Sequence, residues 1–310
     1  MRVYQIKRGI NLIDLEPPIP GFTASLGTYV IRDRGIALID PGPSASVNNL
    51  LSGLEALHIR PESVNYIVCT HIHLDHSGGL GSILKLLPSA RAIVHEKAVP
   101  HLIDPARLWA GSRQVLGQLA LDYGQPEPVP AERLTVAREG GLIDLGNFKL
   151  EVVLTPGHAP HHLSLLDKSL GILFVGEAAG AYFQDIQLIL PSTPPPFDLA
   201  SAISSLDKLM AWQPREICYA HFGSAADAVV RMKQYQKMLI EYGRLILRQA
   251  DKDRVFVFNE ILRTTSLQET LSHLPPDRRQ TCLSLLQNSV AGFLDYFQRS
   301  GTGIITRYDH

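Results

Sequence analysis

The feature that most constrains the fold is a cluster of metal-binding side-chain types directly after an apolar segment. Residues 71–76 read His-Ile-His-Leu-Asp-His and contain three imidazoles and one carboxylate. The apolar residues 64–69 before them predict a buried strand. A glycine pair and a helical pattern over residues 80–87 follow, and these predict a turn and a helix. The cluster therefore lies at a strand-to-helix junction.

This cluster predicts a site for two metal ions. Residues two apart in an extended chain project to the same side, so His71 and His73 act as one pair. Asp75 and His76 follow the start of the turn and face a second point nearby. Neutral imidazole is the commonest protein ligand for metals, and a carboxylate supplies negative charge for a divalent cation. A packed core would have to satisfy all four groups without a cation, which is costly.

Composition excludes several classes of partner. The 310 residues are 45% hydrophobic and 19% charged, and 29 basic side chains balance 30 acidic ones. A nucleic-acid binder usually carries a basic excess, which this chain lacks. The three scattered cysteines form no disulfide framework, and no signal-peptide core or membrane span is visible. We therefore predict a cytoplasmic protein that acts on a small molecule, with no nucleic-acid or membrane partner.

Strand patterns form two sets, separated by a proline-rich break at residues 125–130. The expected strands cover residues 3–6, 10–13, 23–31, 35–39, 64–69 and 90–94 before the break, and 142–145, 148–154, 172–175 and 215–219 after it. Further helices are expected over residues 47–57, 198–210 (capped by Asp198) and 225–249. Residues 96–123 form a mostly helical insertion that either roofs the site or packs on the outside, and packing is favoured.

The sequence around the cluster resembles a known family. His71-Ile72-His73-Leu74-Asp75-His76 resembles the HxHxDH signature of the metallo-β-lactamase superfamily, and the flanking Ile-Asp-Pro-Gly and Gly-Gly are similar too. The resemblance implies an α+β fold, a four-layer αβ/βα sandwich with the metals at one edge of two packed sheets. Residues 1–250 would form this catalytic domain and residues 251–310 a helical C-terminal extension. The role of the extension as lid, dimer contact or passive addition is left open.

The resemblance also requires three more ligands in a set order, namely a histidine, a bridging carboxylate and a last histidine. His158, Glu177 and His221 appear in that order, each after an expected strand. The family normally has aspartate where this chain has Glu177. The longer side chain leaves the metal identity and the strength of the second site open.

Other residues have expected supporting roles. By resemblance, Asp40 supports the metal loop, although a strand-ending turn residue is an equal alternative, and His162 is a hydrogen-bonded support. His161 has no assigned role. A proline-rich loop over residues 191–197 is expected at the mouth of the pocket. The aromatic side chains near it are candidate substrate contacts, with packing under the loop favoured: Tyr182, Phe183 and Phe197.

By resemblance, the seven side chains bind two divalent cations, zinc being expected first and iron or manganese being alternatives. The expected ligands are His71, His73 and His158 for one metal, Asp75, His76 and His221 for the other, and Glu177 as the bridge. A hydroxide shared by the metals would attack an ester, thioester, lactone or phosphoester, and Asp75 is the expected catalytic residue that orients the nucleophile or carries its proton.

Differences from related families at two positions narrow the group within the superfamily that this chain resembles. His73 stands where the flavodiiron reductases have glutamate, and true β-lactamases lack a carboxylate at position 177. The resemblance then favours a hydrolase similar to glyoxalase II and the lactonases, although no basic cluster for glutathione carboxylates is evident. The alternatives are a mononuclear-iron enzyme similar to the persulfide dioxygenases and a non-catalytic metal-binding protein. Substrate, native metal and oligomeric state, including a homo-oligomer, stay open.

Overall fold

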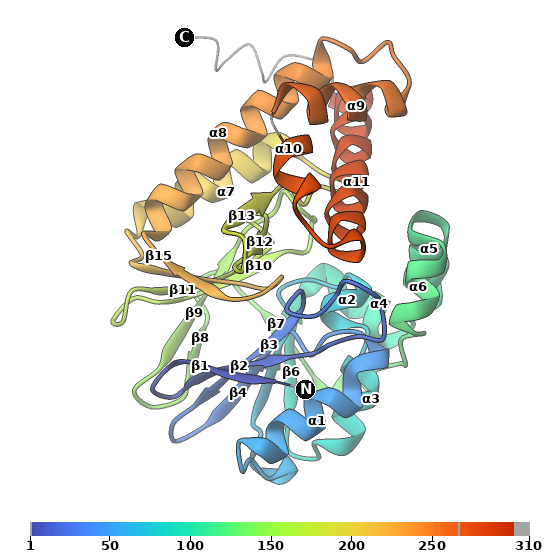
Figure 1. Ribbon diagram of the computed structural model, residues 1–310. Helices are drawn as coiled ribbons and strands as arrows, with labels where there is room; N and C mark the ends of the chain where they lie inside the picture. Colours follow the sequence, from blue (N-terminus) through green and yellow to red (C-terminus); the bar gives the residue numbers. More distant parts are fainter. Residues whose placement is uncertain (1, 266, 301–310) are drawn as a thin grey trace.

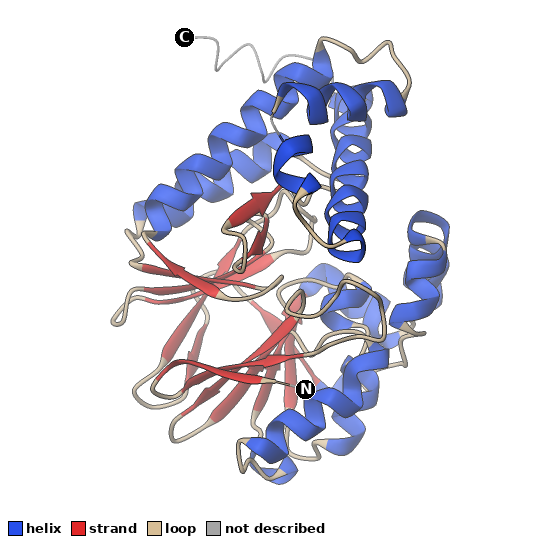
Figure 2. Cartoon of the chain, in the orientation of Figure 1, coloured by secondary structure: helices blue, strands red, loops and turns tan. Residues whose placement is uncertain are grey.

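The computed structural model describes residues 2–265 and 267–300, so the last ten residues of the predicted extension lie outside the described chain. Two large sheets pack face to face, and helices cover the outer face of each (Figures 1 and 2). This arrangement confirms the predicted four-layer αβ/βα sandwich with C-terminal helices. Within the described ranges, no helix has the length and apolar character needed to cross a bilayer.

The first sheet has seven strands in chain order. Its first four strands form an antiparallel meander, and the last four, from β4 onward, run parallel. The strands are β1 (Val3–Lys7), β2 (Ile10–Asp14), β3 (Gly27–Arg32), β4 (Ile36–Ile39), β5 (Tyr66–Val68), β6 (Arg91–His95) and β7 (Leu134–Ala137). The connections carry helices α1 (Val47–Ala56), α2 (Leu74–Ser77) and α3 (Leu80–Leu86), and the insertion helices α4 (Val99–Ile103), α5 (Ala106–Leu116) and α6 (Gln118–Tyr123).

The second sheet has the order β15-β14-β11-β10-β9-β8, in which β11 and β14 run parallel. Its strands are β8 (Leu142–Asp144), β9 (Lys149–Leu154), β10 (Leu163–Asp167), β11 (Ile172–Gly176), β14 (Glu216–Tyr219) and β15 (Ser224–Ala226). A separate hairpin joins β12 (Ala181–Phe183) to β13 (Leu188–Leu190). The outer helices are α7 (Leu199–Ala211), α8 (Ala228–Leu247), α9 (Arg254–Thr264), α10 (Leu267–Ser272) and α11 (Pro276–Ser300).

Strand alternation divides the apolar side chains among three hydrophobic cores. In β11, Phe174 faces the core between the two sheets, whereas Leu173 and Val175 face the helices. In β3, Tyr29 faces the core between the sheets and Val30 faces the helices of the first half. The helix-side core of the second sheet also contains side chains of α9, α10 and α11. The described part of the extension therefore shares its core with the second half of the sandwich.

Several boundaries differ from the sequence expectations. The strand expected over residues 23–31 begins at Gly27, because the chain turns at Ala24, where φ is +51°. The insertion is broken at Gly117, which has a φ of +57°, so α5 and α6 are separate. The prediction that residues 215–219 form the last strand was wrong, since β15 follows and pairs with β14. Asp198 caps α7 as predicted, accepting a 2.7 Å hydrogen bond from Ser201 N.

The buried carboxyl group of Asp14, at the end of β2, should make the stability of the protein depend on pH. Burial raises its pKa to about 6, although the backbone N–H groups of Ala24 and Glu16 hydrogen-bond to it. The folded state then holds the proton more tightly than the unfolded state. The contribution of Asp14 to the free energy of unfolding is fully present below about pH 4. It is lost as the pH rises through about 6.

Asp14→Asn is neutral at every pH but has one acceptor oxygen fewer for the N–H groups of Ala24 and Glu16. We therefore expect its unfolding free energy to rise relative to that of the wild type by about 2 kcal/mol between pH 4 and pH 8. Urea unfolding at intervals from pH 4 to pH 8 measures this. The difference between wild type and variant should grow across that range, and a constant difference would contradict the assignment.

Candidate metal centre

The 71–76 cluster is held in place by a buried carboxylate from the neighbouring strand end. Asp40 follows β4 in the left-handed region, with a φ of +56°. It accepts hydrogen bonds from Thr70 N at 2.7 Å, from Thr70 Oγ1 at 2.8 Å and from His76 Nδ1 at 3.2 Å. Asp40 thus supports both ends of the loop, as the resemblance implied.

The remaining candidate ligands come from the second sheet. His158, Glu177 and His221 follow β9, β11 and β14, and their loops meet the Thr70–Ser77 loop at one edge of the sandwich. The structure brings all seven predicted site residues together, in two groups. We call His71, His73, His158 and Glu177 the three-histidine group. Asp75, His76 and His221 form the aspartate group.

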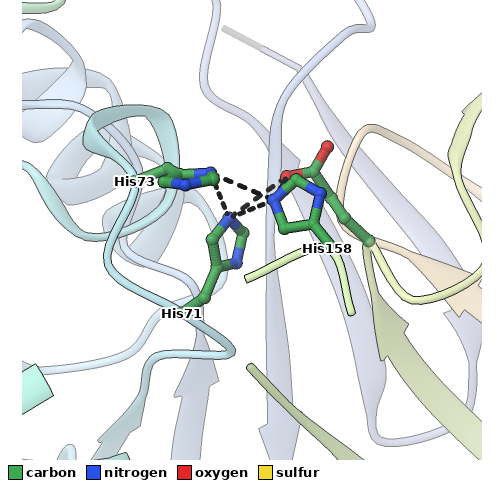
Figure 3. A group of neighbouring side chains, drawn as sticks. His71, His73 and His158 are labelled. Atoms are coloured by element: carbon green, nitrogen blue, oxygen red, sulfur yellow. Dashed lines mark hydrogen bonds and ion pairs between the residues drawn. The ribbon is translucent and has the colours of Figure 1, made fainter. Parts of the chain in front are cut away.

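The three-histidine group converges on one point (Figure 3). His71 Nε2 lies 3.1 Å from His73 Nδ1 and 3.2 Å from His158 Nε2, and the last pair, His73 Nδ1 and His158 Nε2, is 3.0 Å apart. Tetrahedral ligands at zinc–nitrogen distances of 2.0–2.1 Å are about 3.3 Å apart. The spacing of the nitrogens therefore fits a small cation at their centre.

Hydrogen bonds on the far side of the rings determine which nitrogen faces inward with a lone pair. His158 Nδ1 donates to the carbonyl oxygen of Ser192 at 2.7 Å, which leaves Nε2 unprotonated in the neutral ring. Thr70 Oγ1 gives its proton to Asp40, so it accepts from His71 Nδ1 at 3.0 Å, and His71 Nε2 is also unprotonated. Burial lowers the pKa of His71 well below its ordinary value and that of His73 to about 4, so both rings are neutral at neutral pH.

These inward lone pairs need a cation. Glu177 Oε2 lies 2.9 Å from His158 Nε2 and 3.1 Å from His71 Nε2, so acceptors face acceptors in a buried site. Protons would satisfy only some of these contacts, whereas one divalent cation satisfies all of them at once. The donor set therefore fits a metal ion.

The aspartate group adjoins the three-histidine group and also contacts the Glu177 carboxylate. His76 Nε2 is buried without a hydrogen-bond partner, 3.5 Å from Asp75 Oδ2 and 3.3 Å from Glu177 Oε2. His221 Nε2 lies 2.8 Å from Glu177 Oε1 and 3.8 Å from Asp75 Oδ2. Glu177 thus presents Oε2 to the three-histidine group and to His76, and Oε1 to His221, so its carboxylate contacts members of both groups.

The charges of this group also demand a positive partner. Burial lowers the pKa of His76, but the nearby carboxylates, Asp75 foremost, outweigh it and raise that pKa well above its ordinary value. Burial raises the pKa of Asp75, but the His76 charge outweighs it and brings the pKa to about 2. A bound cation would take the place of the proton on His76 Nε2.

His162 lies behind the ligands. Its Nε2 accepts a 3.0 Å hydrogen bond from Glu177 N, and its Nδ1 lies 2.8 Å from Thr155 Oγ1. Burial lowers its pKa well below the ordinary value, so it stays neutral and holds the Glu177 backbone, in line with its expected support role. His161 lines the cavity instead, with its Nδ1 buried and without a hydrogen-bond partner.

Ser192 is a site residue that the sequence reasoning missed. Its carbonyl accepts from His158 Nδ1, and its hydroxyl donates to Glu177 Oε1 at 2.5 Å. One serine therefore orients two candidate ligands. Nothing local marks it in the proline-rich segment, because its two partners are distant in sequence and meet it only in the folded chain.

A cavity of about 700 Å³ opens onto the two groups. Its walls come from the 19–25 loop, α5, α6, the 192–196 loop and α11. Leu108, Val115 and Leu119 of the insertion line it, and α5 has no fully buried side chain. Five partly buried apolar side chains of the insertion also pack on the helix-side core of the first sheet, namely Val99, Leu108, Trp109, Leu116 and Leu119. The insertion therefore roofs the site as well as packing on the outer layer.

The three aromatic candidates for substrate contact differ in what they touch. Phe183 lines the cavity but is only 2% exposed, and the Arg278 guanidinium lies 4.8 Å from its ring centroid. Tyr182 instead packs against Tyr219 with ring centroids 4.8 Å apart, and Phe197 packs against Phe293 at 4.9 Å. Packing, the favoured alternative, accounts for those two.

Comparison with known proteins agrees with this geometry. The family model described as "Metallo-beta-lactamase superfamily" matches residues 21–221. The metallo-beta-lactamase fold-containing protein ST1585 of Sulfurisphaera tokodaii is 30% identical over 261 residues, which cover 83% of this chain and 92% of that protein.

Two further similarities concern a named activity and the fold. The N-acyl homoserine lactonase AttM of Rhizobium radiobacter is 31% identical over 182 residues, which span 53% of this chain and 65% of the lactonase. The crystal structure of the family protein TTHA1429 from Thermus thermophilus has a TM-score of 0.70 at 22% identity, and the match covers 96% of this chain and 95% of that one. This last similarity shows the fold.

Proposed function

The chain belongs to the metallo-β-lactamase superfamily, and from that premise we propose that it is a dinuclear metal-dependent hydrolase of small neutral esters or lactones. The observation that carries the proposal is the placement of Glu177 between the two groups of candidate ligands. In the proposed site the three histidines of the three-histidine group hold one cation, the aspartate group holds the other, and Glu177 bridges them. Zinc is the first candidate, with iron and manganese as alternatives.

Two bound divalent cations would lower the pKa of a water molecule and offset the negative charge that develops on a carbonyl oxygen. The side chains do the rest. Asp75 stays ionised at working pH, so a carboxylate oxygen accepts a hydrogen bond from the attacking water and can take up its proton. The hydrogen bonds of Asp40 and Ser192 keep His76 and His158 oriented during turnover.

The cavity supports the choice of substrate class. Apolar side chains dominate its walls, among them Phe22, Leu108, Val115, Leu119 and Leu285. Among the described residues that line it, Arg107 is the one Lys or Arg, and Asp277 is a nearby acid. A phosphoester or another polyanion would need more positive charge along this wall. A neutral acyl compound fits better, and the lactonase activity of AttM supports the same class.

Metal analysis and a substrate panel test the function. Protein purified without chelators should contain two equivalents of metal and hydrolyse lactones or carboxylic esters faster than thioesters and phosphodiesters. One equivalent of iron and oxygen consumption with a persulfide would favour the dioxygenase alternative. No stoichiometric metal would remove the proposal.

Acyl-chain length should govern the catalytic efficiency. Burying a methylene contributes about 0.8 kcal/mol, so kcat/KM should rise by up to about fourfold for each carbon added to an unbranched acyl chain. The rise should end when the chain fills the cavity. A series of nitrophenyl esters from acetate to decanoate measures this, and a flat or falling series would contradict an apolar acyl site.

The remaining expectations stay predictions. They are the absence of nucleic-acid and membrane partners, the cytoplasmic location and the homo-oligomer.

A further inference from the structure

We infer that α11 is part of the metal centre: Ser289 is a positioning residue that holds the 191–193 segment so that Ser192 can orient His158 and Glu177. This inference rests on the proposed function, because it assigns to the C-terminal helix a role in metal binding. It gives the extension a task other than lid, dimer contact or passive addition.

The first step is the contact between α11 and the loop. The buried Ser289 donates from Oγ to the carbonyl of Pro191 at 2.7 Å and accepts at Oγ from Thr193 N at 3.2 Å. Thr193 Oγ1 donates in turn to the carbonyl of Ser289 at 3.2 Å. The residues on both sides of Ser192 are therefore tied to a single residue of the helix.

The second step is how closely the helix approaches. A Cβ on Gly292 would overlap the carbonyl oxygen of Thr193, so the helix backbone lies directly on the loop at this turn. The next three residues of the loop are Pro194, Pro195 and Pro196, which have no backbone N–H to donate to a sheet. The helix thus bonds the backbone groups of Pro191 and Thr193 directly before a segment that cannot join a sheet.

The third step is that α11 is itself firmly held. Phe293 and Tyr296 pack against Phe197, with ring centroids 4.9 Å and 6.2 Å apart, and Arg299 donates to the carbonyl of Phe197 at 2.8 Å. The side chains of Cys282, Leu286 and Val290 belong to the core that α7 and α8 share. A helix fixed in this way can keep the loop in one position.

One face of α11 lines the cavity, and a different face contacts the loop. Gln280, Ser284 and Asn288, spaced by four residues, line the cavity, whereas Ser289, Gly292 and Phe293 contact the loop and its neighbours. A change at Ser289 therefore alters the support of the ligands without removing a side chain from the cavity wall.

The test compares Ser289→Ala with Ser300→Ala, a serine change at an exposed position of the same helix. The dissociation constant for Zn²⁺ is measured by competition with a chromophoric chelator, and the visible spectrum of the Co²⁺-loaded protein reports on ligand geometry. Loss of a group that is hydrogen-bonded to a ligand typically weakens metal binding 10–100-fold, and Ser289 acts on such a group, Ser192. We expect about tenfold weaker Zn²⁺ binding and a shifted Co²⁺ spectrum for Ser289→Ala, with wild-type values for Ser300→Ala.

Thr193→Val provides a second, independent variant, because it removes the donor to the Ser289 carbonyl and keeps the side-chain volume. It should weaken Zn²⁺ binding in the same direction, and combination with Ser289→Ala should be less than additive, since both act on one contact. Folded variants, judged by circular dichroism, that bind Zn²⁺ like wild type would overturn the inference and leave the proposed function standing. Failure of the wild type to bind metal would instead overturn the proposed function.

Discussion

His73→Ala is expected to abolish hydrolysis, with kcat/KM at least about 1,000-fold lower, while the protein stays folded. His73 Nδ1 lies 3.1 Å from His71 Nε2 and 3.0 Å from His158 Nε2, so its loss opens the three-histidine group. Fewer ligands hold the cation, and both its affinity and its ability to acidify water fall. Steady-state kinetics with the best ester of the panel and elemental analysis of the same sample measure the two effects together.

His273→Ala serves as the matched control, because His273 is an exposed histidine outside both groups. It should keep wild-type kinetics and metal content. Asp75→Asn gives a complementary result, since it keeps the side-chain shape and removes the charge. It should lower kcat more than it lowers the metal content of the three-histidine group. Full activity in His73→Ala would refute the assignment of the site.

We expect Arg278→Met to lower the free energy of unfolding by about 3 kcal/mol. Arg278 is a buried residue at the start of α11 and donates to the carbonyls of Gly21 and Thr23 at 3.3 Å and 3.1 Å. It also donates to Ser25 Oγ and pairs with Asp185 at 3.1 Å. Methionine keeps the apolar stem but removes the donor to the buried Ser25 hydroxyl and to the part-buried carbonyl oxygens of Gly21 and Thr23. Each buried group left unsatisfied costs about 1–3 kcal/mol.

Urea unfolding at pH 7 measures this effect, and Arg279→Met is the control. Arg279 is the adjacent, half-buried residue of the same helix. It should change the unfolding free energy by less than about 1 kcal/mol. An equal effect of both variants would show that the helix tolerates loss of the Arg278 guanidinium, contrary to the hydrogen-bond pattern.

Local patterns in the sequence predict many of the strands and helices, and the family resemblance predicts that the candidate site converges. Each of His158, Glu177 and His221 follows an apolar run that ends in a turn, and ends of neighbouring strands meet at one sheet edge. Asp40 and His162 were also placed in supporting roles that agree with their hydrogen bonds. Short-range periodicity locates the strand ends, whereas the resemblance to the metallo-β-lactamase superfamily supplied the order of the ligands and these supporting roles.

The parts that were missed depend on contacts between distant segments. Strand β10 follows the histidine-rich turn directly, and its polar Ser164 and Asp167 interrupt the apolar pattern, yet it is the central partner of β9 and β11. Ser192 and Ser289 look like ordinary polar residues of a loop and a helix. Their roles follow from partners such as His158 and Pro191, which no spacing rule connects to them.

The contact of Ser289 with the loop before the prolines has a consequence for how the molecule matures. The amino end of a chain leaves the ribosome first, so all seven candidate ligands emerge before α11 does. A nascent chain that has not yet exposed this helix carries every ligand, but nothing from α11 supports Ser192. Tight metal binding would then come late, after both sheets have been synthesised. A protein truncated before Ser289 would bind zinc weakly in the cell.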